Sequence, residues 1–180
     1  MPRLSSVKES DLSPELIAQL EPTRIGGNIA DVYLQFANSE AALLGYLAME
    51  RSLQAGSLTN RDIETVKLLV SEITRCDYCL SVHTMKARKA GLDKEMQKSI
   101  RIGSDTGDQR LNSIATIVRT FFSSPGTLDA TLLAEARSAG LTDANLVDIT
   151  MAVSTIFFTN ITNHINDTES SLPPAPEIDS

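Results

Sequence analysis

Apolar residues recur along the chain every three or four positions, the spacing that places them on one face of an α-helix. In residues 60–73, for example, such a stripe follows Thr59, a residue type that often caps helix N-termini. Capping residues and glycine stops divide the rest of the chain in the same way. We expect helices over residues 14–21, 28–37, 39–55, 60–73, 77–90, 93–102, 108–122, 127–139 and 143–165. Because no segment alternates like a half-buried strand, the sequence predicts an all-α fold.

Two short stretches of the sequence repeat at a distance of 49 residues. Residues 87–92 read Ala-Arg-Lys-Ala-Gly-Leu and residues 136–141 read Ala-Arg-Ser-Ala-Gly-Leu, so each combines a helix end with a glycine stop. The helices before them align loosely, and leucines stand in the second copy where the first has Cys79 and His83. The sequence therefore predicts a helical bundle with an internally repeated helical hairpin, of which one copy carries the reactive side chains.

The length and composition of the chain favour one ordinary globular domain. A chain of 180 residues with 42% hydrophobic and 22% charged residues can bury a substantial core. We expect a single all-α domain over residues 1–180, with its core at about 13–166. Three prolines interrupt residues 167–180, so this tail cannot be helical and is expected to be extended or disordered.

Charge and hydropathy limit the expected partners and the compartment. The net charge is −7 and there is no basic run, so the chain has no footprint for nucleic acid or anionic lipid. No apolar run approaches the roughly 20 residues that span a membrane, and the N-terminus lacks the apolar stretch of a signal peptide. We therefore expect a cytoplasmic protein without nucleic-acid or membrane partners.

Both cysteines of the chain and one of its two histidines lie in one short segment. On a helix, His83 lies one turn after Cys79, and Cys76 is close enough to Cys79 to form a disulfide. If the helix begins near Cys76, its N-terminal dipole favours a thiolate on Cys79, and His83 can accept the proton. A carboxylate of the preceding helix could orient the histidine, and Glu64 and Glu72 are both candidates. This pattern is typical of a redox-active dithiol.

Other interpretations of the same residues stay open. A CxxC pattern with a histidine supplies three zinc ligands, and His164 or a glutamate could be the fourth, although structural zinc usually draws on a second CxxC or an HxxxH pattern. The cysteines could also be small buried apolar residues. A further alternative is a non-enzymatic module, redox-sensing or metal-binding, whose dithiol regulates a partner.

The motif as a whole resembles a known family. Glu64 is followed by eleven residues, Cys76, two residues, Cys79, three residues and His83. This E-x11-C-x2-C-x3-H pattern is similar to that of the alkyl hydroperoxidase D and carboxymuconolactone decarboxylase family, and the resemblance covers roughly residues 30–166. An Asn-His pair late in the last predicted helix, Asn163-His164, is shared with some members.

The resemblance implies an all-α fold, a homo-oligomer and a peroxidase cycle. In that cycle Cys79 would attack the hydroperoxide, and Cys76 would resolve the resulting sulfenic acid as a disulfide. His83 would relay the proton and Glu64 would be the base, with Glu72 as the second candidate. An external dithiol or a disulfide-reducing protein would restore the thiols, so that no metal and no bound organic cofactor is needed.

One position departs from the peroxidase branch of the family. Tyr78 stands where that branch carries a histidine, so we expect Tyr78 to be packing or a pocket wall, with His164 as a second pocket candidate. The leading prediction is a thiol-dependent hydroperoxide reductase of the antioxidant type. A lactone decarboxylase-like enzyme is an alternative, because some family members are of that kind and would not need two cysteines.

Overall fold

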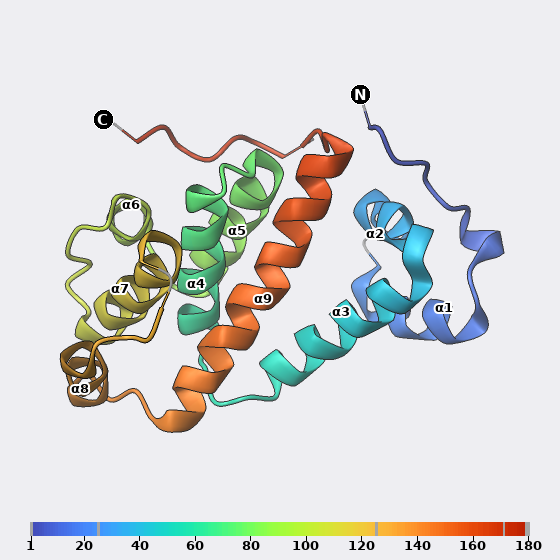
Figure 1. Cartoon of the computed structure of the whole chain (residues 1–180). Helices are drawn as coiled ribbons and strands as arrows, with labels where there is room; N and C mark the ends of the chain where they lie inside the picture. The colour runs from blue at the N-terminus through green and yellow to red at the C-terminus, as the bar shows by residue number, and fades with distance from the viewer. Residues whose placement is uncertain (1, 25, 125, 171, 179–180) are drawn as a thin grey trace.

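The computed structural model describes residues 2–24, 26–124, 126–170 and 172–178, and these residues form an all-α structure without a β-strand (Figure 1). The predicted fold class is therefore confirmed. Short 3-10 turns connect some of the helices. The α-helices are α1 (Pro14–Leu20), α2 (Asp31–Phe36), α3 (Glu40–Gln54), α4 (Asn60–Ile73), α5 (Asp77–Lys89), α6 (Lys94–Ile102), α7 (Gln109–Ser123), α8 (Ala130–Ser138) and α9 (Asp143–Asn166).

Two of the predicted helix starts are wrong. The helix expected from residue 28 begins at Asp31, because Ile29 turns into the N-terminal core from a non-helical stretch. The helix expected from residue 127 begins at Ala130, because Asp129 caps it by accepting the backbone N–H of Thr131 at 2.7 Å. A carboxylate is a strong N-cap, so it fixes the first turn at its own position.

The start of helix α4 is fixed by side-chain hydrogen bonds. Thr59 accepts the backbone N–H of Asp62, and the Asp62 carboxylate accepts the backbone N–H of Thr59, which together form a capping box. The same carboxylate receives a forked pair of hydrogen bonds from Arg110 of α7, with Nε and Nη2 at 3.1 and 3.0 Å. Asp62 is buried, so the start of α4 is tied to α7 as well as to its own first turn.

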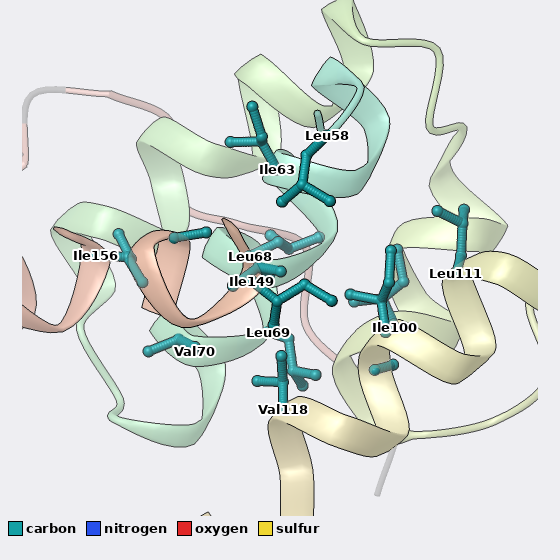
Figure 2. Packing of buried hydrophobic residues seen from close by; sticks show 14 of the residues in the cluster. Leu58, Ile63, Leu68, Leu69, Val70, Ile100, Leu111, Val118, Ile149 and Ile156 are labelled. Atoms are coloured by element: carbon teal, nitrogen blue, oxygen red, sulfur yellow. The ribbon is translucent and has the colours of Figure 1, made fainter. Parts of the chain in front are cut away.

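Helix α4 lies at the centre of the larger of two hydrophobic clusters. Its residues from Asp62 to Ser71 are all buried, and α5, α6, α7 and α9 pack around it. Figure 2 shows side chains of α4, α6, α7 and α9 meeting around Leu69. The residues labelled there are Leu58, Ile63, Leu68, Leu69, Val70, Ile100, Leu111, Val118, Ile149 and Ile156. A helix enclosed on all sides is a rigid support for any polar group that it carries.

The second cluster joins the N-terminal helices to α9. Residues of α1, α2 and α3 surround Phe36, which meets Phe158 of α9 edge-on with ring centroids 5.6 Å apart. Tyr46 of α3 stacks on the same Phe158 at 5.5 Å. Because α9 also packs against α4, it contacts both clusters (Figure 1).

The two repeated sequence stretches form equivalent turns. Gly91 and Gly140 both have a left-handed backbone, with φ of +88° and +83°. In the first turn Leu92 donates its N–H to the carbonyl of residue 87 at 2.9 Å, and in the second Leu141 donates to residue 136 at 3.0 Å. This is the Schellman pattern that ends a helix with glycine. The shared geometry at the ends of α5 and α8 supports the predicted repeat of the hairpins α4–α5 and α7–α8.

Helix α9 is long and apolar enough to span a membrane by length and composition, with a mean hydropathy of 1.3 over its best window. The helix at the core of a globular protein has the same character. One face of α9 is buried here against α3, α4, α5 and α7.

The tail after α9 is not helical and lies across the bundle. Ala175 packs against the larger cluster, and Nη1 of Arg101 in α6 donates to the carbonyl of Pro176 at 2.6 Å. In Figure 1 it runs from the end of α9 towards α6 over the ends of α4 and α5. Residues 171, 179 and 180 of the predicted tail lie outside the described residues.

Candidate active site

The two cysteines lie at the start of α5, at its corner with α4. Cys76 is the N-cap residue of α5 and Cys79 lies in its first turn, and both are reduced and only 3% exposed. The corner is tight because α4 ends in a Schellman turn: Arg75 N–H donates to the carbonyl of Glu72, and Cys76 N–H donates to that of Ser71, both at 3.0 Å. Arg75 takes the left-handed conformation there, with φ of +57°.

This corner brings Glu64 and His83 of the motif together in a buried place, but not Glu72. His83 of α5 faces α4, and its Nδ1 lies 2.7 Å from Oε2 of Glu64, with both side chains about 90% buried. Burial raises the pKa of the Glu64 carboxyl, but the charge and hydrogen bond of His83, together with Lys86 and Lys67, outweigh it and lower that pKa. Burial also lowers the pKa of His83. At neutral pH the imidazole is therefore neutral, and it donates from Nδ1 to a carboxylate.

The tautomer of His83 follows from this pair. An ionised carboxylate only accepts hydrogen bonds, so Nδ1 carries the proton and Nε2 carries the free lone pair. A neutral histidine oriented by a buried carboxylate is the arrangement of a general base. His83 is one helical turn after Cys79 on α5, so the base and the second thiol share one face of that helix.

The two thiols differ in acidity. A hydrogen bond from the Cys79 thiol outweighs burial and lowers the pKa of Cys76 to about 6. The same hydrogen bond, together with burial, raises the pKa of Cys79. The reduced pair therefore holds its first negative charge on Cys76 and its remaining proton on Cys79.

Helix α9 supplies the other neighbours of the sulfurs. Nδ2 of Asn163 donates to Sγ of Cys79 at 3.2 Å, and the Cys79 thiol lies 3.9 Å from Oγ1 of Thr159. Asn160 donates a hydrogen bond to Cys76 that contributes to its lowered pKa. From the sequence, Asn163 was noted only as part of the Asn-His pair of the resemblance, and Asn160 and Thr159 were not noted. The available signal was their polarity on the buried face of an otherwise apolar helix.

The second candidate base is engaged elsewhere. Oε2 of Glu72 lies 2.7 Å from Nε of Arg101 in α6, so its carboxylate is paired with a guanidinium rather than with the imidazole. Glu64 is therefore the carboxylate that the structure brings to His83.

The two pocket candidates, Tyr78 and His164, flank the dithiol. Tyr78 is half-buried beside both cysteines, and burial followed by the charge of Cys79 raises the pKa of its phenol. His164 is exposed, and its Nε2 lies 2.8 Å from the carbonyl of Thr74, one of the free carbonyls at the end of α4. His164 also lies near enough to Cys76 to help lower the pKa of that thiol.

An aromatic group and a buried ion pair lie on the α3 side of the site. Lys67 of α4 is buried and donates to both carboxylate oxygens of Glu50 at 2.6 and 2.7 Å. Burial, followed by the charge of Glu50, raises the pKa of the Tyr46 phenol, and the nearby Cys79 raises it further. The Cys79 thiol is thus close to the aromatic surface formed by Tyr46 and Phe158.

Other possible binding places lie apart from this cluster. Among the described residues, no group of three His, Cys, Asp or Glu side chains is placed to hold a metal ion. A surface pocket of about 530 Å³ lies between α7 and α8, in the second hairpin, and is lined mainly by polar residues. It contains none of the site residues named above.

The fold and the cluster define an all-α protein that carries a buried dithiol beside an oriented histidine. Residues 37–107, which include the whole motif, match the sequence model of the carboxymuconolactone decarboxylase family. The segment that carries the motif is thus similar to this family, and the predicted resemblance is confirmed. No curated protein sequence matches the chain significantly.

Solved structures share the fold over nearly the whole chain. The alkylhydroperoxidase AhpD core protein from Ralstonia eutropha JMP134, described as an uncharacterized peroxidase-related protein, aligns with a TM-score of 0.82 and 15% identity over 94% of this chain and 92% of that one. The putative antioxidant defence protein AhpD, ATU0492, from Agrobacterium tumefaciens aligns with a TM-score of 0.68 and 21% identity over 76% and 95%. The debrominase Bmp8, in complex with 2,3,4-tribromopyrrole, aligns with a TM-score of 0.74 and 14% identity over 94% and 91%. At these identities the likeness establishes the fold.

Proposed function

We propose that the protein is a thiol-dependent hydroperoxide reductase of the antioxidant type. The observation that carries the proposal is the buried Glu64–His83 pair, 2.7 Å apart. His83 of this pair lies one helical turn after Cys79 of the CxxC dithiol. A dithiol supplies the two electrons that cleave a peroxide bond, and a neutral histidine supplies the proton transfer.

The first step is the attack of a thiolate on the terminal oxygen of the hydroperoxide. Cys79 is the proposed nucleophile: its sulfur forms a bond to that oxygen, the O–O bond breaks, and Cys79 becomes a sulfenic acid. The proton of the Cys79 thiol passes to Nε2 of His83 and then to the departing alkoxide, which leaves as an alcohol. Glu64 holds the transient imidazolium by its charge.

The second step closes the disulfide. The thiolate of Cys76 attacks the sulfur of the sulfenic acid, an S–S bond forms, and hydroxide leaves as water after taking a proton. An external dithiol or a disulfide-reducing protein then reduces the disulfide by thiol–disulfide exchange. We propose the cytoplasm as the location, because its thiol pool would keep that partner reduced.

Peroxide consumption by the full-length protein tests the proposal. Hydrogen peroxide and an organic hydroperoxide are offered with dihydrolipoamide or dithiothreitol as donors, and free thiols are counted before and after. We expect turnover with two thiols lost per chain on oxidation and regained on reduction. Cys79→Ser should abolish consumption, whereas Cys76→Ser should consume one equivalent and retain a sulfenic acid on Cys79 that a dimedone-type probe labels. Unchanged turnover in Cys79→Ser would disprove the proposal, and labelling of Cys76 in that variant would reverse the two roles.

A second candidate function follows from the fold shared with the debrominase Bmp8. A dithiol can also remove bromine from an aromatic ring: two thiols become a disulfide, the C–Br bond becomes C–H, and bromide leaves. The same assay with a brominated pyrrole in place of the peroxide measures bromide release. Bromide release without peroxide consumption would favour this function over the leading one.

The remaining alternatives predict different outcomes. A redox-sensing module would oxidise and reduce its thiols reversibly without turnover, and a metal-binding module would retain about one zinc per chain through mild chelation. A lactone decarboxylase-like activity would survive the replacement of both cysteines by serine.

A further inference from the structure

Two asparagines of α9 stand opposite the two cysteines of α5. Asn160 and Asn163 have the same three-residue spacing as Cys76 and Cys79. Asn163 donates its amide N–H to Sγ of Cys79 at 3.2 Å. Asn160 donates to Oγ of Ser71 at 3.5 Å and lies close enough to Cys76 to help lower the pKa of that thiol. Helices α5 and α9 pack against each other, which places the two amides beside the two sulfurs.

Both side chains are buried, and each is only half satisfied. Asn160 is 0% and Asn163 is 4% exposed. The carbonyl oxygen of each amide has no hydrogen-bond partner among the described residues. An unpaired buried acceptor destabilises a fold, whereas an apolar side chain of similar shape at the same place does not. A purely structural need would therefore be met better by leucine at both positions.

We propose that Asn160 and Asn163 are positioning residues, one for each sulfur, which determine which cysteine of the dithiol carries the thiolate. Asn160 holds the charge on Cys76, and Asn163 allows Cys79 to carry it. The inference concerns the thiols themselves, and it rests on the proposed function only for its consequence in turnover.

Asn163 is the nearer of the two α9 side chains that can donate to a thiolate on Cys79, with its Nδ2 3.2 Å from the sulfur. The hydroxyl of Thr159 lies 3.9 Å from the same sulfur, and its one proton is shared with the carbonyl of Ile156 at 2.9 Å, so it is the weaker donor. When Cys79 loses its proton, the N–H of Asn163 remains the closest side-chain donor to its sulfur. Attack by Cys79 thus depends on Asn163.

Other ionisable side chains also surround the two sulfurs, and they come from several helices. Tyr46 approaches from α3, Glu64 from α4, Tyr78 and His83 from α5, and His164 from α9. None of these side chains is altered by a substitution at Asn160 or Asn163. A change in one thiol's titration can therefore be assigned to the amide that faces it.

The test is the pH dependence of alkylation of each cysteine in the full-length protein. Cys76→Ser leaves Cys79 as the sole thiol, and Cys79→Ser leaves Cys76. In each background, Asn163→Leu and Asn160→Leu are compared by their rates of reaction with iodoacetamide between pH 5 and 10. We expect Asn163→Leu to raise the pKa of Cys79 by about one unit, a roughly tenfold loss of thiolate at neutral pH, while Asn160→Leu leaves Cys79 unchanged. The opposite pattern is expected for Cys76.

Several results would overturn the inference. Equal shifts of a given thiol by both leucine variants, or no shift by either, would show that the amides do not divide the sulfurs between them. If a leucine variant fails to fold, Asn163→Asp and Asn160→Asp replace it, because a carboxylate of the same size cannot donate and should raise the facing pKa further. Failure of the peroxidase proposal is seen separately: the wild type would consume no peroxide while the thiol titrations still shifted.

Discussion

At the scale of single residues, the two candidate bases differ in the side chain of another helix with which each one pairs. Glu64 and Glu72 are two turns apart on α4, so their spacing puts both on similar sides of the helix. Glu64 meets a neutral imidazole in a buried place, whereas Glu72 meets the guanidinium of Arg101 in a half-exposed one. A carboxylate that is already paired with arginine cannot raise the basicity of His83.

Replacing Glu64 by glutamine should therefore affect catalysis far more than replacing Glu72. In Glu64→Gln we expect kcat/KM for hydroperoxide to fall by about 100-fold, within the range of general-base effects. The acid limb of its pH profile should move to lower pH, because Glu64 raises the pKa of His83 against the effect of burial. The matched variant Glu72→Gln loses only a half-exposed ion pair and should stay within about twofold of wild type. Equal losses in both variants would contradict the assignment.

The sequence predicted one half of this site and not the other. The thiols and the histidine belong to one helix, so their spacing alone places them together. The amide of Asn163 reaches Cys79 across 84 positions of chain, and a contact of that range depends on how α9 packs on α5. Local patterns carry no information about such packing, so Asn163 was noted only as part of the Asn-His pair, and Asn160 and Thr159 were not noted.

At the scale of helices, a glycine ends both α5 and α8, the two helices whose C-termini repeat in the sequence. A residue with a Cβ atom is strained in the left-handed conformation of Gly91 and Gly140. A Cβ atom added at either position would meet no atom within 4 Å, so the cost of substitution comes from the backbone alone. The two turns should therefore respond alike.

We expect Gly91→Ala and Gly140→Ala each to lower the free energy of unfolding by about 1 kcal/mol, or about 2–4 °C in Tm. Gly45→Ala is the matched control: Gly45 lies inside α3, also has no neighbour within 4 Å of an added Cβ, and does not have a left-handed backbone. Alanine there should raise stability by about 0.5–1 kcal/mol. Thermal denaturation of the three variants checks the signs, and a stabilising Gly91→Ala or Gly140→Ala would contradict the Schellman assignment.

Helix starts were predictable where a capping side chain stands at the boundary and no other interaction shifts it. Thr59 and Thr142 each form a capping box at the expected place. The helix starts predicted at residues 28 and 127 were wrong, because in each case another interaction makes the helix begin about three residues later. Ile29 is buried in the core from the non-helical stretch that precedes α2. Asp129 is a better N-cap for α8 than the residues before it.

At the scale of the whole molecule, α9 connects the parts that the site needs. It packs on α4 and α5 at the dithiol and on α3 beside the N-terminal cluster, so the aromatic surface of Tyr46 and Phe158 and the amides of Asn160 and Asn163 share one helix as support. The all-α class was predictable from periodicity. The central place of α4 and α9 was not, because both clusters join residues that lie far apart in the sequence.

The outward face of α9 is the basis for the homo-oligomer that we propose. Phe157, Ile161 and Ile165 are spaced four residues apart and are 39%, 42% and 55% exposed, which forms an apolar stripe along the last three turns. Apolar stripes of this kind usually mark a surface that another chain covers. In a symmetric dimer the same stripe would serve both copies.

Sedimentation equilibrium of the full-length protein tests this stripe. We expect concentration-dependent association that Ile161→Glu weakens at least about tenfold, because the carboxylate would be desolvated at the centre of the contact. Ile102→Glu introduces the same charge at an exposed apolar residue of α6 and should leave association unchanged. A wild-type protein that stays monomeric at all concentrations would rule out the oligomer, and equal effects of both variants would show that net charge, rather than the face of α9, controls association.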